Sequence, residues 1–112
     1  MQLFMLILKK TEVIDTLIHE LFEAGIKGGT IIDGEGMAAS LQNMDDIPMF
    51  GMLRRAIMSS DRETVKTILL VLKDEQVQET IAVVKRVVGD LKEPNTGIMF
   101  TLPINNVEGF GA

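Results

Sequence analysis

Two glycine-containing segments are the places in this sequence where chemistry with a small ligand is conceivable. Asp33-Gly34-Glu35-Gly36-Met37 carries a Gly-x-Gly pattern, and such a turn lets the backbone approach a ligand and direct amide N–H groups at an anion. Pro94-Asn95-Thr96-Gly97 offers turn geometry with a hydroxyl and an amide. Either segment alone is more typical of an ordinary turn or bulge, because the first lacks the third glycine of a dinucleotide fingerprint and the lysine of a P-loop. The candidate ligand-binding residues are Gly34, Glu35, Gly36, Met37, Asn95, Thr96 and Gly97.

Catalytic and metal-binding side chains are scarce. The chain has no Cys and a single His, so the usual transition-metal clusters and nucleophilic triads cannot be assembled. His19 falls on the polar arc of an expected helix, where a solvated surface histidine is the ordinary interpretation. Acidic side chains such as Asp45, Asp46 and Glu12 are placed as caps or surface charge. We therefore expect a protein that is not an enzyme and that holds no metal.

The elements that must position the two segments alternate in type along a chain of 112 residues, which is the size of one domain, 1–112. An apolar run at 3–8 predicts a buried strand, and it is too short to cross a bilayer. Helical periodicity follows from Val13, with Thr11 as the expected cap and Gly25 as the terminator. The remaining expected elements are a strand at 30–32, a strand at 63–72, a helix capped by Asp74 and ended by Gly89, and a strand at 96–102 stopped by Pro103.

The two halves of the chain match at one fixed offset. Lys9, Val13, Thr16 and Gly25 recur as Lys73, Val77, Thr80 and Gly89. A strand–helix unit is therefore used twice. This order predicts an α+β, ferredoxin-like βαββαβ fold, in which a four-stranded antiparallel sheet carries two helices on one face.

One helical layer covers only one face of such a sheet, yet the strands at 3–8 and 68–72 are apolar on both faces. Self-association of identical chains is the economical way to cover the second face. The alternative is that the long insertion folds over it. Nucleic acid is not expected there, since the net charge is −5 and the only aromatic residues are five Phe. The lack of Cys fits a reducing compartment, so we expect a cytoplasmic protein without stable membrane insertion.

The segment 33–61 is too long for a plain connection between strands, and insertions of this length are usually functional or disordered. Apolar residues at helical spacing predict a short helix at about 47–58, and Gly51 makes that helix marginal. It is either a small helix docked on the body or a mobile recognition element whose methionines adapt to different surfaces. The expected partner-binding residues are Met49, Phe50, Met52, Arg54 and Arg55.

The chain resembles the P-II family of nitrogen-regulatory signalling proteins, in a divergent form. The resemblance lies in the order of elements, in the long insertion after the second strand, and in the glycine-containing segments at 33–37 and 94–97. The matching blocks are Leu6–Gly25, Ile26–Thr30, Asp33–Gly36 and Thr96–Phe100. The resemblance implies signal transduction by a homotrimer whose sheets face the centre. It also implies ligand clefts between subunits and a long loop that contacts target proteins.

Carried over by residue, Gly34 and Gly36 stand where the family has loop-base glycines, and Gly97 matches a glycine of its phosphate-contacting turn. Classical members bind adenine nucleotides, often with 2-oxoglutarate. Here the next position is Ile98 instead of lysine, and 105–110 contains no cation. A triphosphate needs charge-assisted donors, so the cofactor is unknown: an adenine nucleotide is possible, but basic phosphate-binding residues are missing. Uridylylation at tyrosine is excluded because the chain has no Tyr.

Two rival functions use the same fold. An acylphosphatase-like enzyme needs an anion-cradling loop with an arginine after the first strand, and Lys9-Lys10-Thr11 is short and has none. A module resembling the ACT domain would sense an amino acid, but such modules are usually attached to an enzyme.

Overall fold

A computed structural model describes residues 1–37 and 64–110. It is an α+β fold with one four-stranded antiparallel sheet and two α-helices, as the sequence predicts. The strands are β1 (Gln2–Leu8), β2 (Thr30–Glu35), β3 (Thr64–Leu72) and β4 (Gly97–Pro103), and their order across the sheet is β2-β3-β1-β4. The predicted helix at 47–58, with Met49, Phe50, Met52, Arg54 and Arg55, lies outside the described residues.

Each strand–helix unit passes through a 3-10 turn before its helix. The first unit has η1 (Thr11–Val13) and α1 (Ile14–Glu23), and the second has η2 (Asp74–Gln76) and α4 (Val77–Val88). The predicted caps are therefore wrong: Thr11 and Asp74 open the 3-10 turns, and the residues at the N-caps of the two helices are Val13 and Gln76. Both predicted terminators are confirmed, since Gly25 and Gly89 take φ values of +91° and +93°.

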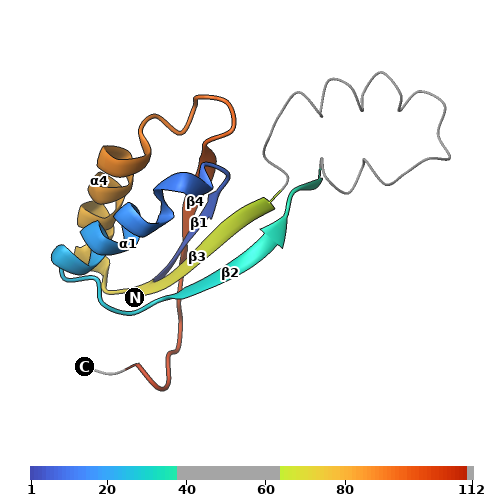
Figure 1. Ribbon diagram of the computed structural model, residues 1–112. Helices are drawn as coiled ribbons and strands as arrows, with labels where there is room; N and C mark the ends of the chain where they lie inside the picture. Colours follow the sequence, from blue (N-terminus) through green and yellow to red (C-terminus); the bar gives the residue numbers. More distant parts are fainter. Residues whose placement is uncertain (38–63, 111–112) are drawn as a thin grey trace, which may run out of the picture.

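Both helices lie against one face of the sheet (Figure 1). Alternation along the strands explains why: in β1, Phe4, Leu6 and Leu8 are buried while their neighbours are only half-buried. The helices contribute the other half of the core. Its buried members are Phe4, Leu6, Leu8, Leu17, Leu21, Ile26, Ile68, Leu70, Leu72, Val77, Val83, Val84 and Val88.

Among the described residues, no helix or strand packs on the other face of the sheet (Figure 1). The C-terminal segment reaches one end of this face, where Phe110 lines a groove together with Leu3, Leu69 and Val71. The pairing register places on this face side chains that are mostly apolar, because directly paired residues of antiparallel strands point to the same side. We call its apolar side chains that are at least partly exposed the open face: Leu3, Met5, Ile7, Ile32, Leu69, Val71, Ile98, Phe100 and Leu102. Ile98 is 56% exposed and Leu102 48%.

Three strands depart from their predicted bounds, and β1 does so by one residue, since it begins at Gln2. β2 continues through Asp33, Gly34 and Glu35, which pair with β3, so the segment predicted as a Gly-x-Gly turn is mostly strand. β4 begins at Gly97 and includes Pro103 as its last residue. Among the described residues, no helix is long and apolar enough to cross a membrane.

Candidate ligand site

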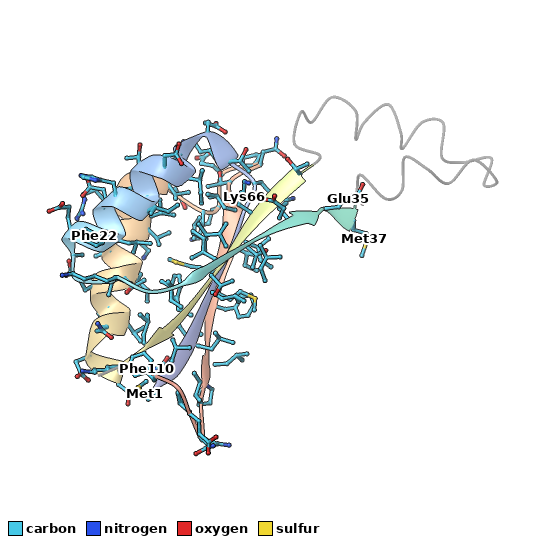
Figure 2. The ribbon with its side chains drawn as sticks, turned by 60° about the horizontal axis from the view of Figure 1, so that its bottom comes forward. Met1, Phe22, Glu35, Met37, Lys66 and Phe110 are labelled. Atoms are coloured by element: carbon cyan, nitrogen blue, oxygen red, sulfur yellow. The ribbon has the colours of Figure 1, made fainter. Side chains whose placement is uncertain are left out.

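The two glycine segments lie at the same end of the sheet but on opposite edges. One row of paired residues runs across all four strands: Gly97 pairs with Leu8, Leu8 with Lys66, and Lys66 with Asp33. Three strand spacings separate the outer members of this row, which is about 14 Å. Figure 2 shows Glu35, Met37 and Lys66 toward this end, away from Met1 and Phe110. A single copy therefore does not join the two segments into one cleft.

On the β2 edge, Gly34 pairs with Val65 inside the ladder. A Cβ on Gly34 would lie 3.1 Å from Cγ2 of Val65, so glycine leaves room for that buried valine. Gly36 follows the strand and has open space where a Cβ would be. Met37 is 80% exposed. Of the predicted ligand residues on this edge, Glu35 and Met37 are exposed and Gly36 is partly exposed, while Gly34 serves packing.

On the β4 edge, the turn before the strand is held from within. The Thr96 hydroxyl donates to the Pro94 carbonyl oxygen at 3.3 Å, and Thr96 is 6% exposed. The backbone N–H groups of Lys9 and Lys10 both donate to the Thr96 carbonyl oxygen, at 2.9 and 3.2 Å. Thr96 is thus a structural residue of the turn. Asn95, exposed and at φ +61°, is the side chain that the turn presents outward.

Gly97 is required by a close backbone approach. A Cβ at this position would lie 2.5 Å from the Ile7 carbonyl oxygen, and the φ of +152° is one that other residues rarely adopt. The glycine therefore sets how closely β4 approaches the end of β1. The packing against Ile7 is by itself sufficient to explain why this position is a glycine, whether or not a phosphate binds beside it.

Sequence reasoning missed the lysines at this end of the sheet. Lys9 and Lys10 mark the end of β1, and the β1–β4 pairing brings their backbone against the Asn95–Gly97 turn. The Lys10 ammonium donates to the Val88 carbonyl oxygen at 3.5 Å, near the C-terminus of α4, where a cation is favourable. Lys66 on β3 forms an ion pair with Asp33. No signal in the sequence linked these residues to position 97, because the contact depends on strand pairing.

The charges of the two edges have opposite signs. Asp33 and Glu35 lie on the β2 edge, whereas Lys9 and Lys10 lie beside the start of β4. Opposite charges on two complementary surfaces favour their association and fix its orientation. Within 1–37 and 64–110, no three His, Cys, Asp or Glu side chains gather as a metal site.

No protein-family model matches the chain, and no curated protein matches it.

Proposed function

We propose that this chain is a cytoplasmic, non-enzymatic regulatory protein similar to the P-II family, which assembles as a homotrimer and senses a small metabolite or nucleotide at the seams between its subunits. The segment 33–61 would then act on a partner protein. A ferredoxin-like classification is supported by the element order and by the strand order β2-β3-β1-β4.

The observation that carries the proposal is the open face. Nine apolar side chains on four adjacent strands form one surface, and contiguous apolar patches of this kind mark interaction sites. Burying apolar area contributes about 25 cal/mol per Å². Copies of the chain supply the matching apolar surface, and the sheets would face the centre of the assembly.

The seam follows from the positions of the two sheet edges. In a closed ring, the β2 edge of one copy meets the β4 edge of the next, and each such contact is heterologous. This arrangement would bring Glu35, Gly36 and Met37 of one copy beside Asn95 and Gly97 of its neighbour. Because Asp33 is paired with Lys66 of its own chain, the acidic side chain that this arrangement would place opposite Lys9 and Lys10 is Glu35, and this supports the same pairing of edges.

The ligand proposed for this seam is an anion. The backbone of Lys9 and Lys10 contacts the Asn95–Gly97 turn, and their side chains would partly supply the positive charge that Ile98 lacks. Two lysines suit a small metabolite carboxylate or a nucleotide with few phosphates better than a triphosphate, which normally needs several charge-assisted donors.

The test is the mass of the assembly in dilute buffer, measured by light scattering after size-exclusion chromatography. We expect a trimer for the natural chain and dissociation for Phe100→Glu, since this change puts a charge on the open face. Phe22→Glu is the matched control, because Phe22 is 53% exposed on α1, on the helical side. Circular dichroism establishes that both variants are folded.

A monodisperse monomer of the natural chain would remove the proposed architecture. Equal dissociation by Phe22→Glu would show that the helical side forms the contact instead. Thermal-shift measurements with ATP, ADP and 2-oxoglutarate then test the ligand, since any molecule that binds only the folded state raises the midpoint.

A further inference from the structure

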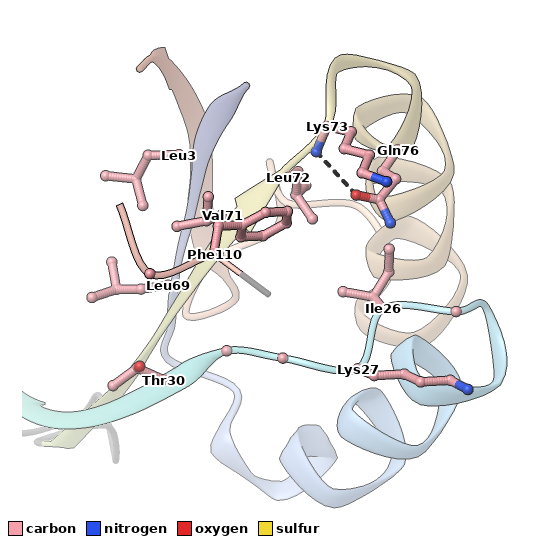
Figure 3. Close-up of a pocket in the computed structure, with 14 residues that line it drawn as sticks. Leu3, Ile26, Lys27, Thr30, Leu69, Val71, Leu72, Lys73, Gln76 and Phe110 are labelled. Carbon is pink, nitrogen blue, oxygen red and sulfur yellow. Dashed lines mark hydrogen bonds between the residues drawn. The ribbon is translucent and has the colours of Figure 1, made fainter. Parts of the chain in front are cut away.

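A groove of about 660 Å³ lies beside Phe110 (Figure 3), at the other end of the sheet from Glu35 and Met37 (Figure 2). The 25–30 connection forms one wall, and Gly109 and Phe110 from the C-terminal segment form another. Lys73 and Gln76, at the start of the second helical unit, complete it. None of the residues predicted to bind a ligand contributes to this groove.

The polar corner of the groove contains donors. The Lys73 backbone N–H donates to Oε1 of Gln76 at 2.9 Å, which fixes the amide orientation and leaves Nε2 as a donor. The Lys73 ammonium has no carboxylate partner among the described residues. The neighbouring carboxylate, Asp74, is instead engaged by the Met1 amine at 3.0 Å. One ammonium and one amide NH₂ therefore offer hydrogen bonds without an acceptor of their own in the part of the chain that the structure describes.

The rest of the lining is apolar. Leu3 and Val71 belong to the rim of the open face, at the start of β1 and the end of β3. Figure 3 shows the Phe110 ring beside Val71, between the sheet and the 25–30 connection. Gly28 and Gly29 bring no side chains into the lining. The groove thus combines an aromatic and aliphatic surface with a small cationic corner, as small-molecule sites commonly do.

We propose that this groove binds a small monocarboxylate with an apolar body. The carboxylate would accept hydrogen bonds from the Lys73 ammonium and from Nε2 of Gln76, and the apolar body would lie against Phe110, Val71 and Leu3. A single charge suits the corner, because one ammonium is on offer and the carboxylates of Asp74 and Glu75 follow directly in sequence. All of the lining residues belong to one chain, so the groove forms without the proposed trimer, but Leu3, Leu69 and Val71 also belong to the open face that the trimer would cover.

A second lysine in the groove provides the matched control. Lys27 also lines the groove, but its ammonium lies over the Phe22 ring, 5.3 Å from the ring centre. Figure 3 shows the Lys27 side chain directed along α1, away from Lys73 and Gln76. Lys27→Gln therefore changes the net charge by the same amount as Lys73→Gln without touching the donor corner.

The experiment titrates the full chain with phenylacetate, its neutral isostere phenylacetamide, and inorganic phosphate, while the backbone amides are followed by NMR. We expect phenylacetate to shift the Gly28 and Gly109 signals, and both other probes to bind at least about tenfold more weakly. Lys73→Gln should weaken phenylacetate binding at least about tenfold, Phe110→Ala should weaken it as well, and Lys27→Gln should change it less than about twofold.

Three results would overturn the proposal. One is equal affinity for phenylacetamide, which would leave the carboxylate without a role. Another is an equal loss in Lys27→Gln and Lys73→Gln, which would reduce the effect to net charge. The third is the absence of shifts at Gly28 and Gly109 with phenylacetate and with hexanoate, each up to about 10 mM, where even weak binding is detected. Unchanged melting temperatures of the variants establish that they remain folded.

Discussion

Individual glycines differ sharply in what they do, and the difference is set by the backbone around them. Gly97 sits against the Ile7 carbonyl oxygen, Gly29 against Leu70, and Gly36 has open space on its Cβ side. Sequence alone predicted the two helix-ending glycines, because a helix terminus has a local signature. It could not predict that Gly97 mediates contact between β1 and β4, since that role exists only after the strands pair.

Gly97→Ala should destabilise the protein by about 1–3 kcal/mol, because the new Cβ meets backbone that cannot move independently and the φ is unfavourable for alanine. Urea unfolding monitored by circular dichroism measures the change. Gly36→Ala is the control and should stay within about 0.5 kcal/mol of the natural chain. Similar stability of the two variants would show that β4 does not approach Ile7 closely.

The ion pair of Asp74 predicts a pH dependence. A hydrogen bond from the Met1 amine, the charge of that amine, and a hydrogen bond from Gln2 together lower the pKa of Asp74. A carboxyl with a lowered folded-state pKa stabilises the fold above its unfolded pKa of about 3.9, and the contribution is lost as pH falls through the folded value. Between pH 5 and 2, roughly, Asp74→Asn should therefore lose less stability than the natural chain. Parallel curves from thermal unfolding in that range would contradict this.

At the level of elements, hydropathy patterns predicted the number and type of the described strands and helices, but neither the β2 boundary nor the helix starts. Asp33-Gly34-Glu35 is polar and glycine-containing, so it has low intrinsic strand preference, and pairing with β3 overrides that preference. Thr11 and Asp74 have the chemistry of caps, yet each helix is entered through a 3-10 turn. Entry geometry of this kind depends on how the helix docks on the sheet, which a local pattern does not contain.

The docking of α1 predicts different costs at two adjacent positions. Leu17 is fully buried, whereas the adjacent Ile18, which is also apolar, is 40% exposed. Leu17→Ala should cost about 2–5 kcal/mol and Ile18→Ala less than about 1 kcal/mol. Chemical unfolding of both variants measures the two changes in the free energy of unfolding. A larger cost at Ile18 would mean that α1 is rotated about its axis, or that a partner covers this side.

At the scale of the whole molecule, the candidate site shows which part of a prediction the sequence supports. The sequence identified candidate residues, but it did not show where they lie relative to one another. The Gly34–Met37 and Asn95–Gly97 segments were recognisable by composition, but their position on opposite edges follows from the strand order alone. Lys9 and Lys10 lie beside the Asn95–Gly97 turn because the same strand order pairs β1 with β4. The groove beside Phe110 was not foreseen, because it joins four regions that are distant in the chain and share no pattern.

Hydrogen exchange tests the proposed ring directly. In an isolated copy, β1 and β3 are central and their amides should exchange slowly, while about half of the β2 and β4 amides point outward and should exchange fast. In a closed ring, those outward amides bond to the neighbouring copy and become protected. Mass-spectrometric exchange at two protein concentrations, above and below dissociation, distinguishes the two states. Fast exchange of both edges at the higher concentration would contradict edge pairing.

In the proposed ring, the two different edges of the sheet also create a risk of open-ended assembly. A chain that associates through two different edges forms a closed ring only if the rotation between neighbouring subunits adds up to one complete turn around the ring. If a substitution at the contact between the β2 and β4 edges changed this rotation slightly, the ring would not close. Subunits would then continue to add, and the product would be a filament. Turbidity or fibres from such a variant that still folds would thus be the signature of a head-to-tail assembly that has lost its closure.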